Sequence, residues 1–226
     1  ERDKILRILS HDLKNPLSTI EQYLTIIKEN DLPEETRNKI KNDLMTMTRN
    51  SSEMLHNILQ WSGIKLNKNA YSEELITNKE IAQNLSNIFE QNLQNKNIEL
   101  KLNQEQSFSF VSNRGIILTI IRNLFSNAVK YSFEKSEIQL EFINNSENIE
   151  IRIIDFGVGL SEEARKNLFT QTQNSIPGTQ SEKGSGVGLM ICHDLANELN
   201  GEIFYEQNPV GGSIFGLRIP NTRKNL

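Results

Sequence analysis

Residues 10–17, Ser-His-Asp-Leu-Lys-Asn-Pro-Leu, lie within a repeat of apolar residues that predicts a packed helix. The members of the repeat are Leu6, Leu9, Leu13, Pro16, Ile20, Tyr23 and Ile27. Steps that alternate between three and four residues are typical of helices that pack in a coiled-coil-like bundle. With Leu6 at position a of the heptad, His11 falls at position f, which faces water. The repeat therefore predicts an exposed imidazole rather than a core histidine.

Two polar residues accompany His11 on this helix. Asp12 is its neighbour, and Asn15 lies one turn later, where side chains at i and i+4 share a face. An imidazole, a carboxylate and an amide on one exposed surface are a candidate reactive site.

A second helix is expected to follow the first, which runs from residue 1 to about 30. Asp31-Leu32-Pro33-Glu34 has the spacing of a capping box, with proline tolerated in the first turn. The second seam is Ile40, Leu44, Met47, Ser51, Met54, Ile58 and Trp61. Two antiparallel helices bury such stripes poorly alone, so we expect residues 1–65 to form a homodimer, a dimeric four-helix bundle of two helical hairpins. The alternative is a hairpin that packs on the rest of its own chain.

The remainder of the chain has mixed helix and strand patterns. Residues 66–75 are polar and are predicted to be a linker, and residues 76–226 an α/β sandwich with helices on one face of a sheet. The expected helices are 77–95, 116–131 and 187–200, with Asn113 a possible N-cap of the second. The expected strands are 98–102, 108–111, 138–142, 149–154, 202–205 and 213–219, with a hairpin turn at 144–146. Residues 160–183 form a long polar loop, which is usually functional in a compact domain.

Composition excludes several classes of protein. The 226 residues carry a net charge of −4 without basic clusters, which disfavours a nucleic-acid partner. Cys192 is the single cysteine, so an internal disulfide is impossible and a cysteine-based zinc site is excluded. The sequence has no apolar run long enough to span a membrane, and we expect no membrane contact by this segment and a cytoplasmic location. The chain begins at Glu1 without methionine, so we expect a fragment of a longer protein.

A polar stripe interrupts the apolar helix predicted at 116–131. Asn123, Asn127, Lys130 and Tyr131 lie on one side of it, at i, i+4, i+7 and i+8. Such a stripe is costly to bury unless something binds it. An amide oxygen suits magnesium and a lysine suits phosphate, so the stripe predicts a site for a phosphate-bearing ligand.

Two glycine-rich turns follow the stripe in the chain. Asp155-Phe156-Gly157-Val158-Gly159 comes directly after a predicted strand, and Gly184-Ser185-Gly186-Val187-Gly188-Leu189 opens a helix. Glycine permits close backbone approach, and the N–H groups at a helix start attract phosphate. Either motif alone could be a plain turn. The second is not the dinucleotide fingerprint, because no strand leads directly into it.

Together these motifs resemble the sensor histidine kinases of two-component systems, and the resemblance covers nearly the whole chain. Residues 11–17 are similar to the H box, 123–131 to the N box, 155–159 to the G1 box and 184–188 to the G2 box. The resemblance implies a dimerisation and phosphotransfer hairpin followed by a Bergerat-type ATP-binding domain. It further implies ATP and Mg²⁺ as cofactors, a response regulator receiver domain as partner and residues 160–183 as the ATP lid.

The resemblance also implies a role for each matching residue. His11 would accept the phosphoryl group, Asp12 would accept its ring N–H, and Asn15 would support dephosphorylation of the regulator. Asn127 would hold Mg²⁺ with help from Asn123, and Asp155 would receive the adenine amino group. Nucleotide contacts would further come from Lys130, Tyr131, Gly157, Gly159, Gly184, Gly186, Val187, Gly188 and Leu189.

Two other functions compete with a histidine kinase. A hydrolytic ATPase of the chaperone, gyrase and mismatch-repair type resembles the nucleotide site but uses a glutamate at the start of the N box. That position is Asn123 here, and an amide cannot act as a general base. The other alternative is a dimeric scaffold that binds nucleotide without kinase activity.

Overall fold

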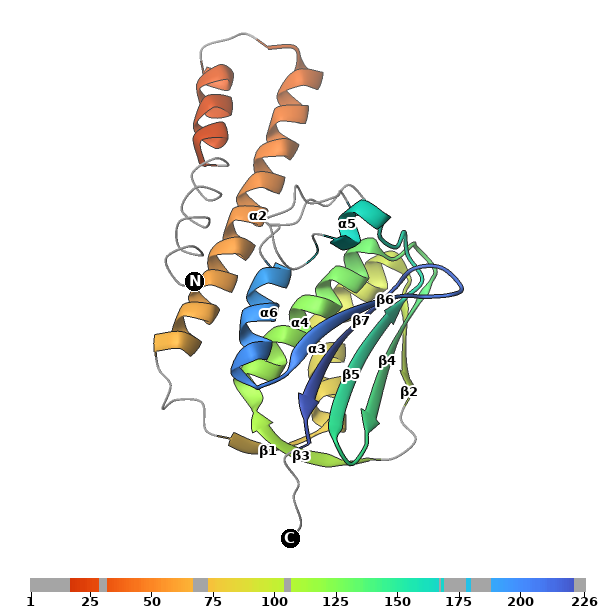
Figure 1. The fold of residues 1–226 in the computed structure, drawn as a ribbon. Helices are drawn as coiled ribbons and strands as arrows, with labels where there is room; N and C mark the ends of the chain where they lie inside the picture. Colours follow the sequence, from red (N-terminus) through yellow and green to blue (C-terminus); the bar gives the residue numbers. More distant parts are fainter. Residues whose placement is uncertain are drawn as a thin grey trace.

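The computed structural model describes residues 17–28, 32–66, 73–103, 107–166, 168, 178–179 and 188–221. It has a helical hairpin and an α/β part (Figure 1). The helices are residues 17–28, α2 (Glu34–Leu66), α3 (Asn78–Lys96), α4 (Arg114–Tyr131), α5 (Glu162–Lys166) and α6 (Gly188–Glu198). The strands are β1 (Glu73–Thr77), β2 (Glu99–Asn103), β3 (Ser109–Asn113), β4 (Glu137–Asn144), β5 (Asn148–Asp155), β6 (Glu202–Gln207) and β7 (Ser213–Pro220).

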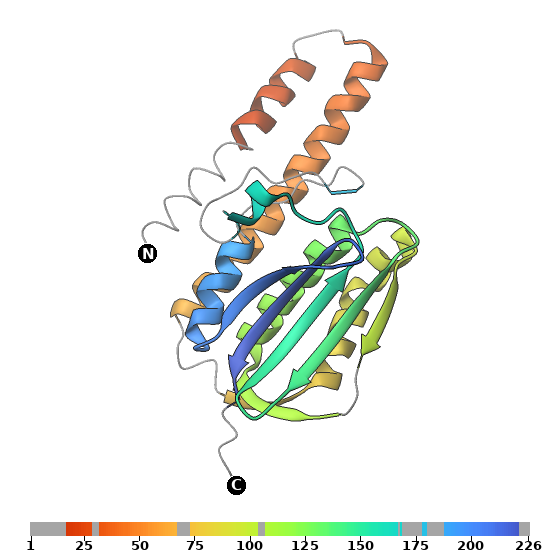
Figure 2. The same cartoon turned by 45° about the vertical axis from the view of Figure 1, so that its right-hand side comes forward.

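The hairpin pairs residues 17–28 with the first part of α2, and the two run side by side in Figures 1 and 2. Ile40 is buried, and Leu44, Met47 and Ser51 are half-buried. These positions confirm the predicted seam where the structure describes its side chains. Further along α2, Ile58 packs against the core of the α/β part, and α2 contacts α4 and α6.

The main sheet has five strands in the order β2-β4-β5-β7-β6. All neighbours are antiparallel except β2 and β4, which are parallel. β1 and β3 form a separate antiparallel pair. The predicted hairpin between β4 and β5 is confirmed, and the Asn145 side chain accepts hydrogen bonds from the main-chain N–H groups of Glu147 and Asn148.

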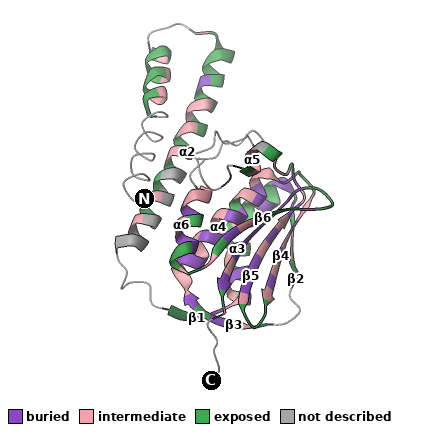
Figure 3. Cartoon of the chain, viewed as in Figure 1, coloured by how far each residue is buried: buried purple, intermediate pink, exposed green. Residues whose placement is uncertain are grey.

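Helices α3, α4 and α6 cover one face of the sheet and leave the other open, as predicted (Figure 2). The cause is the period of two in the strands: Ile149, Ile151 and Ile153 of β5 are buried on the covered face. Asp155 continues this row, so its side chain belongs to the helix side of the sheet. Figure 3 shows that buried residues gather in this α/β part, whereas the hairpin is mostly exposed or intermediate.

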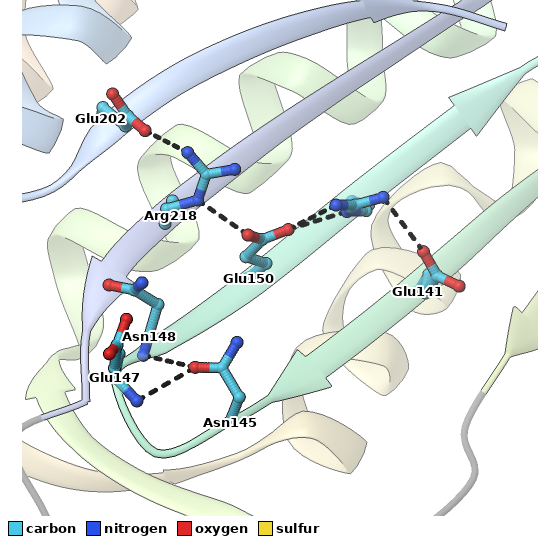
Figure 4. Close-up of polar contacts among 8 residues, drawn as sticks. Glu141, Asn145, Glu147, Asn148, Glu150, Glu202 and Arg218 are labelled. Atoms are coloured by element: carbon cyan, nitrogen blue, oxygen red, sulfur yellow. Dashed lines mark hydrogen bonds and ion pairs between the residues drawn. The ribbon is translucent and has the colours of Figure 1, made fainter.

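The open face of the sheet carries a network of charges (Figure 4). Arg152 lies opposite Glu141 in the register, and Arg218 lies opposite both Glu150 and Glu202. The Glu150 carboxylate accepts a hydrogen bond of 2.7 Å from Arg218 Nε and one of 2.9 Å from Arg152 Nε. Burial raises the pKa of Glu150, but the hydrogen bonds from Arg218 and Arg152 outweigh it, so that this pKa is lowered overall. Opposite charges across neighbouring strands thus support the strand register.

Two features differ from the predicted elements. The predicted linker, residues 66–75, is wrong at both ends, because α2 includes Leu66 and β1 begins at Glu73. Two glutamates at the start of β1 hide its strand pattern, and pairing with the distant β3 forms it. The long polar loop contains the short helix α5, and the hydroxyl of Ser161, just before this helix, accepts from the main-chain N–H of Ala164. None of the helices that the structure describes is long and apolar enough to cross a membrane.

Candidate functional site

Helix α4 has two faces of different character. Its buried residues come in pairs four apart: Ile116, Ile117, Ile120, Ile121, Leu124, Phe125, Ala128 and Val129. Asn123 and Asn127 lie between these pairs, Lys130 and Tyr131 follow the last pair, and all four are half-buried. The helix begins at an N-cap, Asn113, whose side chain accepts from Ile116 N–H as predicted. Core packing thus fixes the rotation of α4 and turns the polar stripe away from the sheet.

The two amides of the stripe are available to a ligand. Within the part of the chain that the structure describes, neither Asn123 nor Asn127 makes a side-chain hydrogen bond. Asn123 faces the first residue of α6: a Cβ on Gly188 would lie 2.5 Å from Asn123 Oδ1. Amide oxygens are hard ligands, so residues of this type on successive turns fit Mg²⁺ that also binds phosphate and water.

Lys130 and Tyr131 end the stripe together. The Lys130 ammonium donates a 3.0 Å hydrogen bond to the Tyr131 hydroxyl and lies 4.6 Å from the centre of its ring. The pair places a positive charge and a polarised hydroxyl at the carboxyl end of α4. A cation held in this way suits an anionic ligand such as phosphate.

Asp155 is the buried acid of the site, with 2% of its surface exposed. Its Oδ1 accepts from Gly157 N–H at 2.9 Å and from Ser213 N–H at 3.1 Å. Burial raises the pKa of Asp155 to about 6 although these two hydrogen bonds oppose the change. Oδ2 receives no hydrogen bond from the residues that the structure describes. It is also not fully enclosed, so a ligand can reach it. This oxygen is a ready acceptor for the amino group of a ligand.

Glycines allow two close main-chain approaches near Asp155, one against the end of α4 and one against Asp155 itself. A Cβ on Gly157 would lie 2.1 Å from Tyr131 O, and one on Gly212 would lie 2.1 Å from Asp155 O. Gly212 also has a φ of 96°, and Gly159, with a φ of 66°, lies against it. The structure therefore brings the predicted G1 residues to the end of α4, where Val158 N–H donates to Tyr131 O at 3.3 Å.

Three residues at Asp155 were not assigned to the site by the sequence predictions. Ser213 supplies a main-chain N–H to Asp155, Asn208 donates to Asp155 O at 3.0 Å, and Gly212 makes the close approach described above. The signal was the pair Gly211-Gly212 before a strand, which is equally typical of a plain turn. Its role depends on the pairing of β7 with β5.

Several predicted site residues lie outside the described residues: His11, Asp12, Asn15, Gly184, Gly186 and Val187. Gly188 and Leu189 lie in the first turn of α6, and both are half-buried. The structure thus brings together the N box at the end of α4, the G1 box at the end of β5 and the start of α6.

The comparisons agree with this geometry. Residues 112–223 match the family of histidine kinase-, DNA gyrase B- and HSP90-like ATPases. The fold and the site therefore define an ATPase domain of this class.

Individual similar proteins indicate which members of this ATPase family the chain resembles. The chain is 29% identical to sensor protein KdpD of Clostridium acetobutylicum, over 97% of this chain and 25% of that protein. It is 28% identical to histidine protein kinase SaeS of Staphylococcus aureus, over 90% of this chain and 59% of that protein. The chain thus spans much less than the full length of these relatives. It shares its fold with histidine kinase ThkA, solved in complex with response regulator protein TrrA, with a TM-score of 0.71 and 19% identity over 98% of this chain and 63% of that one. Together these matches support a sensor histidine kinase catalytic core.

Proposed function

We propose that this protein is an ATP-dependent autokinase that phosphorylates His11 and passes the phosphoryl group to an aspartate of a response regulator. The observation that carries the nucleotide part is Asp155, a buried acid with one oxygen held by main-chain N–H groups and the other open. An acceptor in such a place selects a planar base with an amino group. The start of α6 and the Lys130 ammonium supply positive charge for the phosphates.

The proposed chemistry needs little from the protein beyond positioning and charge neutralisation. A ring nitrogen of His11 forms a bond to the γ-phosphorus, the bond from that phosphorus to the bridging oxygen breaks, and ADP leaves. Asp12 accepts the other ring N–H and thereby orients the imidazole. In the second reaction the N–P bond breaks as a carboxylate oxygen of the regulator bonds to phosphorus. Mg²⁺, held through Asn127 with help from Asn123, would supply charge stabilisation.

Hydrolysis of ATP by water is the weaker alternative. Asn123 occupies the place of the water-activating glutamate, and its amide faces Gly188 at the start of α6. An amide is not a base at neutral pH, so no proton acceptor for water is present on this turn of α4.

A homodimer through residues 1–65 is part of the proposal. Along the described hairpin, large apolar side chains remain exposed, among them Leu24 at 55% and Leu59 at 61%. Exposed apolar side chains on both helices of a hairpin are what a second hairpin would cover in a four-helix bundle. The same bundle is the proposed docking site for a receiver domain, and the complex of histidine kinase ThkA with response regulator protein TrrA supports a partner of that class.

The decisive test is incubation of the chain with Mg-ATP followed by detection of acid-labile phosphate on the protein. We expect label on the wild type and none on His11→Gln, because glutamine has no imidazole nitrogen to form the N–P bond. Bound nucleotide without label on the wild type would support the non-catalytic scaffold instead.

A phosphatase activity toward the regulator is a separate expectation. The Asn15 amide, one turn from His11, would position water on the regulator's phospho-aspartate. Asn15→Ala should leave autophosphorylation within about twofold and slow release of phosphate from the regulator about tenfold, the usual scale for one lost hydrogen bond in a transition state. The two rates are measured separately, with labelled ATP and with prephosphorylated regulator. Equal loss of both would contradict this role of Asn15.

A further inference from the structure

The carboxyl end of α4 joins three distant parts of the chain. A helix leaves carbonyl groups of its last turn without helical partners, and here each of the last four carbonyl groups of α4 accepts a hydrogen bond. Ala128 O accepts from Ser132 N–H, and Tyr131 O accepts from Val158 N–H of the G1 turn. The other two, Val129 O and Lys130 O, both accept from one buried ammonium, that of Lys96.

Lys96 is an unusual lysine because only 3% of its surface is exposed. Its Nζ donates to Val129 O at 3.0 Å, to Lys130 O at 2.9 Å and to the Thr179 hydroxyl at 2.8 Å. An ammonium has three N–H groups, which matches these three acceptors in number. The charge also lies at the negative end of α4, where a cation stabilises a helix.

Thr179 lies in the predicted lid and is bound to the same turn. Its N–H donates to Lys130 O at 3.2 Å, and its hydroxyl donates to Ser132 O at 2.8 Å while it accepts from Lys96. Both carbonyls belong to residues next to Tyr131. The contact therefore ties residue 179 to the turn that carries Lys130 and Tyr131.

We propose that Lys96 and Thr179 are positioning residues of the nucleotide site. They fix the last turn of α4 and hold the chain at Thr179 against it, so that Lys130, Tyr131 and the G1 turn keep the geometry that binds ATP. Neither residue needs to touch the nucleotide. This inference rests on the proposed ATP-binding function.

The test measures ATP affinity, and KM against kcat for autophosphorylation, with Thr179→Val and Thr179→Ser in the full chain. Valine keeps the shape but removes the hydroxyl, and we expect it to raise Kd and KM for Mg-ATP about tenfold, or 1.4 kcal/mol, with kcat changed less than threefold. Serine keeps the hydroxyl and should bind within twofold of the wild type. Thr119→Val is the matched control. The Thr119 hydroxyl donates at 2.8 Å to the carbonyl of Gly115, and both residues lie in α4.

Lys96→Met extends the test to the ammonium. It removes the ammonium that Val129 O accepts from and leaves Lys130 O with Thr179 alone, so it is expected to lower the melting temperature, whereas exposed Lys79→Met on the same helix should not. Adding Thr179→Val to Lys96→Met should weaken ATP binding by less than twofold further, since the two act as one unit.

Three outcomes would overturn the inference. The first is a Thr179→Val protein that binds ATP as tightly as the wild type, and the second is equal loss in the valine and serine variants. The third is a lower melting temperature of Thr179→Val with unchanged ATP affinity, which would indicate a purely structural role. Failure of the wild type itself to bind ATP would instead contradict the proposed function.

Discussion

Asp155→Asn is expected to lower the affinity for ATP more than a hundredfold and to make the unliganded protein more stable near neutral pH. The first effect follows from the open Oδ2, which asparagine replaces with an amide NH₂ group. The asparagine NH₂ group and the adenine amino group are then two donors facing each other, in the place where the carboxylate accepted a hydrogen bond. A lost hydrogen bond to a charged group together with the unpaired donors costs more than the roughly 2.7 kcal/mol of a hundredfold change.

The gain in stability follows from the raised pKa of Asp155. Burial holds this pKa at about 6, above the ordinary value of 3.8. Between those two values the folded protein keeps a proton that the unfolded chain has lost, so the free energy of unfolding falls as the pH rises from about 4 to 6. Above that range the ionised carboxylate costs the fold up to about 3 kcal/mol. Asparagine avoids this cost and keeps an oxygen for Gly157 N–H and Ser213 N–H.

The measurement is thermal unfolding without nucleotide at several pH values, beside calorimetric titration with Mg-ATP. We expect Asp155→Asn to raise the melting temperature at pH 7.5 by about 5 °C, and the advantage over the wild type to vanish near pH 4. Asp43→Asn on α2 is the control, with no change expected in either quantity. A variant that is less stable than the wild type at pH 7.5 would show that the buried charge is compensated more fully than these two N–H groups allow.

The sequence predicted the features of this site that depend on local pattern. The paired apolar residues of α4 and the polar stripe between them are visible as a helical period, and Asn113 has the spacing of an N-cap. Asp155 was found because it follows an apolar strand and precedes two glycines. Each of these signals lies within one element and needs no knowledge of the topology.

Long-range contacts account for the features that the sequence predictions did not assign. Asn208 and Ser213 reach Asp155 from 53 and 58 residues away, through the pairing of β5 with β7. Lys96 reads as an ordinary basic residue in the last turn of a helix, and only the packing of α3 against α4 buries its ammonium. Strand β1 was not predicted, because a strand of five residues that begins with two glutamates shows no alternation of polar and apolar residues.

Asn127→Ala is expected to lower the rate of autophosphorylation at least a hundredfold while leaving the fold intact. The amide oxygen is the proposed protein ligand of Mg²⁺, and alanine offers no oxygen there. Because Asn127 is half-buried and makes no side-chain hydrogen bond with the residues that the structure describes, its removal leaves no described group without a partner. Alanine is also a better helix former than asparagine, so we expect the melting temperature without ligand to stay the same or rise slightly.

The role of Asn127 is separated from general damage by measuring nucleotide affinity with and without Mg²⁺. The wild type should bind ATP more tightly when Mg²⁺ is present, and Asn127→Ala should lose most of that gain but keep the metal-free affinity within about threefold, because Asp155 still holds the base. Asn92→Ala, at an exposed position on α3, should behave as the wild type in both conditions. If Mg²⁺ strengthens ATP binding by Asn127→Ala as much as by the wild type, the metal is held without this amide, and the slower rate must arise from misplaced phosphates.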